Sequence, residues 1–227
     1  MNTSIENLQK NMEELSSMVS CRMGDFEKNL SLSSANPTVK SLAADFHAFK
    51  TLVWKTLGLL KSQIELLAQG MDRLETQSRK KLLLFHGIGE DKDEDVHKKI
   101  LTVLSNEMRI PGISGDHLSS CHRLGSKKDS ARPILVRFSN VHLRSKAWKA
   151  KTNSKGTKIT ITEFLTKCRQ DIFIAARNYF GMKKCWTADG VIVILLPDKS
   201  RIKVTTMLEL KQIISQNPKS EQSSGNK

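Results

Sequence analysis

Paired cysteines, long apolar runs and aromatic residues are all scarce in this chain of 227 residues. The longest uninterrupted aliphatic run, 191–196, is far shorter than the ~20 apolar residues that a membrane-spanning helix needs. The first ten residues include Glu6 and no apolar segment, so we expect no secretory signal. The four cysteines never form a Cys-x-x-Cys pair, which fits a reducing compartment. These absences favour an intracellular protein that is neither secreted nor embedded in a membrane.

Signatures of common enzymes are also missing. The sequence contains no GxxxxGK[ST] phosphate loop and no HExxH motif. The carboxylates of 90–95 are adjacent and local, which is typical of a helix start. Cys121, His122, Cys168 and Cys185 lack the close pairs of a zinc site, and Cys168 lies on an apolar helix face where we expect it to be buried. We therefore expect no catalytic residues, no metal and no cofactor.

Positive charge is abundant and unevenly placed. The chain carries 37 Lys and Arg against 23 Asp and Glu, a formal net charge of +14. Residues 1–80 are nearly neutral, whereas 123–184 hold 16 basic and three acidic residues, a net of +13. Clustered cations neutralise phosphates and release condensed counterions. The clustering favours a nucleic-acid partner over an anionic membrane surface.

The N-terminal third follows heptad spacing. Residues 1–30 are predicted to form a heptad helix, 31–38 a linker that contains Pro37, and 39–80 a coiled coil with one stutter between Val53 and Leu57. This coiled coil predicts self-association as a homotrimer or a homodimer. Its predicted oligomerisation residues are Leu42, Phe46, Phe49, Val53, Leu57, Leu60, Ile64, Leu67, Met71 and Leu74.

The periodicity changes at Lys81. Short apolar strand patterns alternate with helical ones, which predicts a β-α-β-β-α-β domain over 81–162, ferredoxin-like and similar to an RNA-recognition motif (RRM). The fold class is therefore α+β. Strands are predicted at 82–88, 117–124, 133–138 and 158–162, and helices at 96–108 and 141–151.

The third predicted strand decides how this domain can bind. Alternation places Ile134, Val136 and Phe138 toward the helices and Arg137 on the open sheet. The stacking aromatics of an RRM are missing there, and the whole chain holds only 12 Phe, Trp and Tyr. We therefore expect Coulombic and guanidinium contacts to carry binding rather than base stacking.

A small α+β domain is predicted over 163–215. Its elements are a helix over 163–180 that ends at Gly181, a hairpin of 191–196 with 201–204, and a helix over 208–214. The polar tail 216–227 is predicted to be disordered.

The order of these weak motifs resembles the first-open-reading-frame (ORF1) RNA-binding protein of long interspersed (LINE-type) retrotransposons and the related baculovirus few-polyhedra (FP) protein family. The matching segments are 79–81 leading into 84–88, 134–138 (ILVRF), 156–165 (GTKITITEFL) leading into 168–170, and 176–201 with RNYFGMKKCWTADG. The resemblance implies a homotrimeric RNA-binding protein with nucleic-acid chaperone activity that coats its own transcript. It also implies RNA contacts at Arg137, Arg169, Lys80 and Lys81. Retrotransposon proteins of this type usually have a longer N-terminal rod than the one predicted here. Many insect relatives add a zinc finger, which we do not expect in this sequence.

The functional hypothesis is a non-enzymatic, coiled-coil oligomer that binds single-stranded RNA or DNA, in a cytoplasmic ribonucleoprotein or in the nucleus. A structural adaptor that recruits a protein partner through the coiled coil is the alternative. The predicted nucleic-acid-binding residues are Lys80, Lys81, Arg123, Lys127, Lys128, Arg132, Arg137, Lys155, Lys158, Arg169, Arg177, Lys183 and Lys184.

Overall fold

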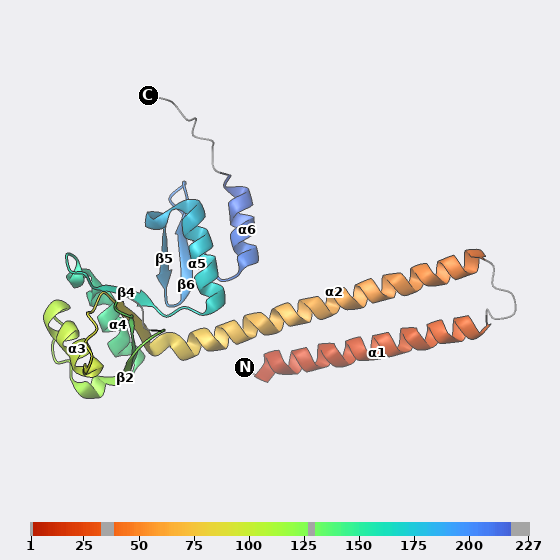
Figure 1. The fold of residues 1–227 in the computed structure, drawn as a ribbon. Coiled ribbons are helices and arrows are strands. Elements are labelled where there is room, and N and C mark those ends of the chain that lie inside the picture. Colours follow the sequence, from red (N-terminus) through yellow and green to blue (C-terminus); the bar gives the residue numbers. More distant parts are fainter. Residues whose placement is uncertain (1, 33–38, 127–129, 219–227) are drawn as a thin grey trace, which may run out of the picture. The chain divides into compact units, whose positions relative to one another are not determined.

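The structure is a computed structural model that describes residues 2–32, 39–126 and 130–218. The chain divides into two compact units, Met1–Met71 and Asp72–Lys227. Helices and antiparallel sheets both contribute, so the predicted α+β class is confirmed (Figure 1). In the described ranges, no helix combines the length and the apolar character that crossing a bilayer requires.

Two long helices build the first unit. They are α1 (Asn2–Leu32) and α2 (Val39–Ser78), and the last turns of α2 belong to the second unit. Residues 39–78 contain no proline and are rich in Leu, Ala and Lys, which favour the helix. Phe26 of α1 and Phe49 of α2 stack with their ring centroids 5.5 Å apart. Most of the predicted linker, residues 33–38, lies outside the described residues.

The second unit contains a four-stranded antiparallel sheet with the strand order β2-β3-β1-β4. A single turn, Arg79–Lys81, leads from α2 into the first strand. Asp95 and Asn140 cap the two helices because their side chains accept backbone N–H groups of the first turn. In chain order the elements are β1 (Leu82–His86), α3 (Val96–Thr102), a π-helical turn (Val103–Glu107), β2 (Leu118–Arg123), β3 (Ile134–Phe138), α4 (Val141–Ala150) and β4 (Thr160–Glu163).

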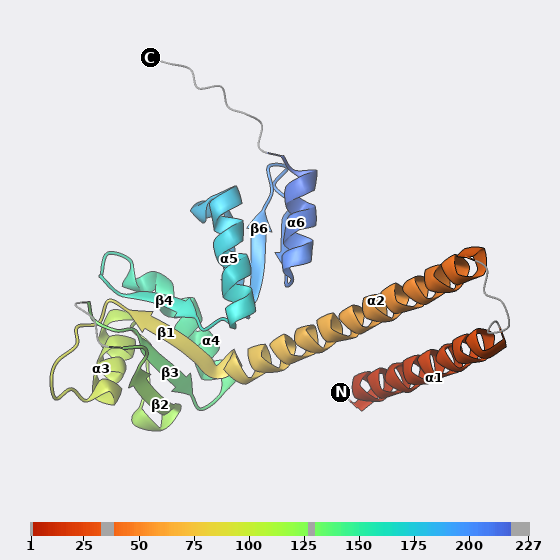
Figure 2. The same ribbon diagram turned by 45° about the vertical axis from the view of Figure 1, so that its right-hand side comes forward.

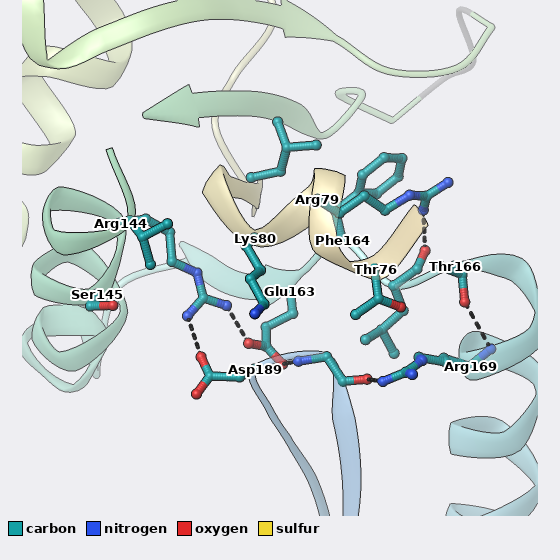
Figure 3. A pocket seen from close by; sticks show the side chains of 14 residues that line it. Thr76, Arg79, Lys80, Arg144, Ser145, Glu163, Phe164, Thr166, Arg169 and Asp189 are labelled. Atoms are coloured by element: carbon teal, nitrogen blue, oxygen red, sulfur yellow. Dashed lines mark hydrogen bonds and ion pairs between the residues drawn. The ribbon is translucent and has the colours of Figure 1, made fainter. Parts of the chain in front are cut away.

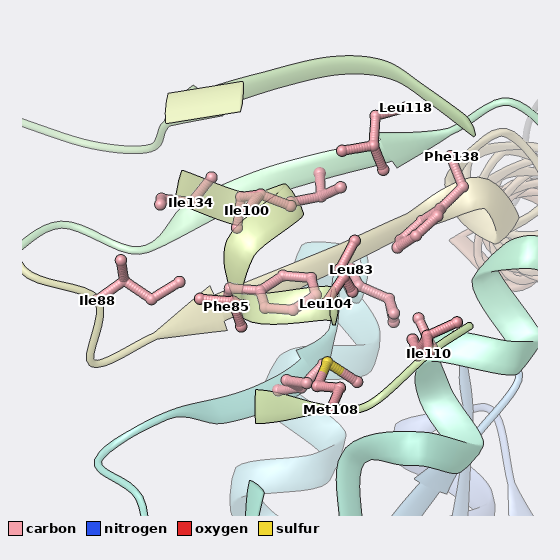
Figure 4. Close-up of a cluster of buried hydrophobic side chains, with 14 residues drawn as sticks. Leu83, Phe85, Ile88, Ile100, Leu104, Met108, Ile110, Leu118, Ile134 and Phe138 are labelled. Atoms are coloured by element: carbon pink, nitrogen blue, oxygen red, sulfur yellow. The ribbon is translucent and has the colours of Figure 1, made fainter. Parts of the chain in front are cut away.

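The core of this sheet lies between its strands and the helices α3 and α4, on one face only (Figures 2 and 4). Alternation in β1 sends Leu83 and Phe85 to that face, where both are fully buried. Ile134, Val136 and Phe138 of β3 join them, as the sequence predicts. The opposite face of the sheet is therefore left without a covering helix from this core.

The C-terminal part of the second unit has its own core. A three-stranded antiparallel sheet, in the order β5-β6-β7, packs its Ile192 and Ile194 against Ile172 of one helix and Leu210 of another. Thr206 and Glu209 form a capping box at the start of the last helix. The elements are α5 (Lys167–Phe180), β5 (Cys185–Ala188), β6 (Val191–Leu195), β7 (Arg201–Val204) and α6 (Met207–Gln216).

Three sequence expectations for this part need correction. The helix predicted from residue 163 starts at Lys167, because Thr166 caps it by accepting the Arg169 N–H and Glu163 ends β4. The strand β5 was not predicted at all. Cys168 is exposed rather than buried, since it lies in the first turn of α5, ahead of the helix positions that contact the sheet. Gly181 does end α5, with a φ of 95°.

Candidate nucleic-acid interface

The open face of the four-stranded sheet carries Arg137. Its strand register places this arginine beside Leu82 of β1 and Ser120 of β2. Arg137 is exposed, and its side chain forms no hydrogen bond or ion pair with any residue that the structure describes. Its guanidinium is therefore available to a ligand. The other side chains that the register assigns to this face are Leu84, His86, His122, Leu135, Thr160 and Thr162.

Among the described residues of this face, His86 and Thr162 form a polar pair, with 3.0 Å between Nε2 and Oγ1. Burial lowers the pKa of His86 below its usual value, because the charged imidazolium loses hydration there. Burial therefore favours the neutral imidazole of His86, which offers hydrogen bonding rather than charge.

Several of the predicted lysines are also free to bind. Lys81 is exposed, and its Nζ donates to the carbonyl oxygen of Ser139 over 3.0 Å. Lys127 and Lys128 lie outside the described residues. Five more of the predicted lysines are exposed and have no ion pair to any described residue: Lys80, Lys155, Lys158, Lys183 and Lys184.

Two predicted contacts, Arg123 and Arg132, are internally neutralised instead. Nε of Arg123 lies 2.7 Å from Oε1 of Glu94, and its other donors reach the carbonyl oxygens of Ile88 and Gly89. Nη2 of Arg132 lies 2.7 Å from Oε1 of Glu90. Hydrogen bonds from these arginines lower the pKa of each glutamate to about 2. The pairs hold the 90–95 segment against the end of β2 and remove two positive charges from the surface.

Arg169 is likewise engaged within the protein. Its side chain is buried, with Nε 2.8 Å from Oδ2 of Asp72 and Nη1 2.7 Å from the carbonyl oxygen of Gly190. It thereby joins α5 to the last turns of α2 and to the β5–β6 turn. Arg177 stacks its guanidinium 4.1 Å from the ring centroid of Phe173. The geometry gives Arg169 a positioning role and keeps Arg177 half-buried.

A cavity of about 230 Å³ lies where the end of α2, α4, the β4–α5 connection and the β5–β6 turn meet (Figure 3). At one side Arg144, which is 4% exposed, pairs with the buried Glu163 and lies 3.2 Å from Asp189. Glu163 also accepts the N–H of Gly190. Lys80 lines the cavity without an ion pair to any described residue, so the cavity has one free ammonium group.

Two buried polar atoms of this cavity have no hydrogen-bond partner among the described residues: Nε of Arg144 and Oγ1 of Thr76. Buried donors without partners carry a desolvation penalty, which a bound acceptor would relieve. Phe164 supplies the aromatic wall, with the Arg79 guanidinium 4.1 Å from its ring centroid. Sequence reasoning missed Arg144 and Glu163, because their partners are distant in the chain and no local motif marks them.

The apolar stripe of α2 is exposed along its whole length. Leu42, Ile64 and Met71 are 59%, 65% and 70% exposed. Such long exposed apolar surfaces are characteristic of interaction sites. Exposed with them are Phe46, Phe49, Val53, Leu57, Leu60, Leu67 and Leu74.

Neither a protein-family model nor a curated protein sequence matches this chain.

Proposed function

We propose that the protein is a non-enzymatic oligomer that binds single-stranded nucleic acid, with RNA as the main ligand. It would act as a coating protein or a nucleic-acid chaperone. The observation that carries the proposal is the exposed, unpaired Arg137 on an open sheet face. Most other arginines of the 123–184 segment are paired with carboxylates or stacked on aromatic rings, whereas this one is free.

The positions of the free lysines support this reading. Lys80 and Lys81 precede β1 at the end where Leu82 pairs with Arg137. Lys158 lies near the other end of β1, since His86 pairs with Thr160. Cations therefore flank the open face along a strand of about 16 Å at ~3.3 Å per residue. The phosphate backbone of a flexible single strand can contact cations spaced over this distance, whereas a small rigid ligand cannot.

The strand order also supports an RRM-like domain. Antiparallel strands in the order β2-β3-β1-β4, connected as β-α-β-β-α-β, correspond to the split βαβ arrangement. Domains of this kind bind single-stranded RNA on the open face of the sheet. Arg137 takes the place of the usual stacking aromatics, and so we propose that phosphate and guanidinium contacts dominate on this face. We also propose that this protein is of the ORF1 or FP type, which its sequence motifs resemble.

The exposed apolar stripe of α2 supports oligomerisation. We propose that α2 forms a coiled coil between copies of the chain, as a homotrimer or a homodimer, because about five heptads of its apolar side chains are exposed to solvent in the single chain. Each copy adds one cationic face. Linked faces raise the effective concentration for a second contact with the same strand, so weak single contacts give tight coating.

The test compares binding of the full chain to a single-stranded RNA, a DNA duplex and anionic vesicles. We expect the RNA to bind most tightly. Arg137→Ala should weaken RNA binding several-fold and reduce the salt slope by about 1. Lys146→Ala, an exposed charge on α4, is the matched control and should leave binding unchanged. Equal losses in both variants, or preference for vesicles, would contradict the proposal.

An adaptor function is the second candidate, favoured by the same exposed stripe of α2. In that case the stripe recruits another protein and the cations only keep the protein soluble. The adaptor function would replace the first proposal if the full chain did not bind RNA and instead formed a stable complex with another protein through α2.

A further inference from the structure

The second sheet also has an open face, formed by β5, β6 and β7. Strand register places Trp186 beside Val193, and Val193 beside Lys203. Leu195 lies beside Arg201 in the neighbouring pair. The alternate residues, such as Ile192 and Ile194, pack against α5 and α6. Trp186, Arg201 and Lys203 therefore share the face that these helices do not cover.

This face combines an aromatic ring with cations. Trp186 is only partly buried, and the guanidinium of Arg201 lies 5.8 Å from its ring centroid, within the range of a cation–π contact. Arg201 and Lys203 are exposed and form no ion pair with any residue in the described part of the chain. Of the residues that the three strands place on this face, none is acidic. Lys183 and Lys184 precede β5 and add to the positive charge.

Trp186 has no counterpart on the first sheet. The open face of that sheet carries no Phe, Tyr or Trp among its described residues. Phe164 near the cavity is already covered by Arg79. Trp186 is thus the one sheet-face indole in the described second unit that is both accessible and flanked by cations.

We propose that the outer face of β5–β6–β7 is a base-stacking platform for single-stranded nucleic acid. A base stacks on Trp186, and Arg201 and Lys203 contact the neighbouring phosphates. Aromatic surfaces bordered by cations bind single strands in this way, because every base offers a π-face and every linkage a negative charge. An apolar protein partner fits poorly, since docking would bury Arg201 and Lys203 without a carboxylate.

The inference rests on the proposed function and adds a mode of contact to it. The first sheet binds phosphates irrespective of base, whereas the second requires unpaired bases. Together they predict that single strands are preferred over duplexes, in which the bases are already stacked. The sequence alone pointed away from stacking, because aromatic residues are few; one well-placed tryptophan suffices for a platform.

The experiment measures the affinity of the full chain for an oligouridylate of about 12 nucleotides, a length within the usual range of single-strand binding sites. It also measures the affinity for an abasic strand of equal length. Trp186→Ala should weaken oligouridylate binding by about 5-fold to 100-fold. Trp186→Phe keeps a π-face and should lose less than about 3-fold. Trp186→Leu keeps apolar bulk without the ring and should resemble Trp186→Ala. None of the three should change affinity for the abasic strand.

The outcomes separate the two proposals. Salt-dependent binding by the unaltered protein that none of the Trp186 variants changes would overturn the platform and leave the proposed function standing. Equal losses on both probes in Trp186→Leu would also overturn it, because the effect would not depend on bases. Absence of binding by the unaltered protein to either probe would overturn the proposed function itself.

Discussion

The buried pair of Arg144 and Glu163 allows a stability prediction to be worked out from its surroundings. Their side chains are 5% and 3% exposed, and the pair joins α4 to the end of β4. Glu163→Ala would leave the Arg144 guanidinium buried beside Asp189 alone, which is 82% exposed and 3.2 Å away. Removing one member of a buried pair costs about 3–5 kcal/mol, because the remaining charge stays desolvated. The N–H of Gly190 would lose its acceptor as well.

Urea unfolding of the full chain, followed by circular dichroism, measures this loss. For a unit of this size, about 3–5 kcal/mol corresponds to a fall in melting temperature of about 6–20 °C. Asp189→Ala is the control: its carboxylate is exposed to solvent, so its removal should cost at most about 1 kcal/mol. The double variant Arg144→Met/Glu163→Leu replaces both charges by apolar groups and should recover much of the loss.

Two results would refute the reasoning. A cost below about 1 kcal/mol for Glu163→Ala would mean that Arg144 finds water or another partner in the folded state. A double variant that is less stable than Glu163→Ala would mean that the pair itself, rather than the stranded charge, supplies the stability.

Three further predictions concern other parts of the chain. The pKa of Glu94 in the folded protein is about 2, below its ordinary value of 4.5. The ionised carboxylate therefore contributes fully to the stability of the fold above pH 4.5, and this contribution is lost as the pH falls toward 2. Glu94→Gln should accordingly show a smaller drop in urea midpoint between about pH 5 and about pH 3 than the unaltered protein. Gly87→Ala should destabilise the fold by about 1–3 kcal/mol in thermal melts, because φ is +81° there and the added Cβ would lie 2.0 Å from the carbonyl oxygen of Lys158. Gly89→Ala is the control: its Cβ would have no atom within 4 Å, so the stability should not change. If the chain oligomerises through α2 as proposed, Ile64→Lys should lower the mass measured by light scattering, while Ser62→Lys, on the opposite side of α2, should not. An unchanged mass for Ile64→Lys would rule out the α2 stripe as the interface.

Local patterns predicted the elements around the sheet well. Alternation in β3 correctly buries Val136 and exposes Arg137, because a strand repeats every two residues. Leu135 shows the limit of this rule. It lies on the open face and is still only 7% exposed, since its cross-strand neighbours Leu84 and His122 flank it.

The ion pairs could not have been predicted from local sequence. Arg169 pairs with Asp72, which is 97 residues away, and Arg123 with Glu94, which belongs to an acidic segment outside the basic stretch. Counting charges along the chain treats every arginine as free. Folding brings carboxylates from outside the basic segment onto four of its arginines, so fewer cations remain for a ligand than the sequence count suggests.

The strand β5 was missed for a related reason. Residues 185–188, CWTA, are too short and mixed to show alternation, and only pairing with β6 makes them a strand. That pairing is also what turns Trp186 to the outer face. Short strands of this kind depend on their neighbours more than on their own composition.

The salt dependence of RNA binding tests the proposed function most directly. Six of the nucleic-acid contacts predicted from the sequence are exposed and have no ion pair to a described residue: Lys80, Arg137, Lys155, Lys158, Lys183 and Lys184. If all six contact phosphates of a single strand, the slope of log affinity against log salt is about −4 per chain, which is roughly a 300-fold loss between about 50 and 200 mM salt. We predict a slope of that size for the full chain on a single-stranded RNA. An affinity that stays constant over the same range would contradict phosphate binding and with it the proposed function.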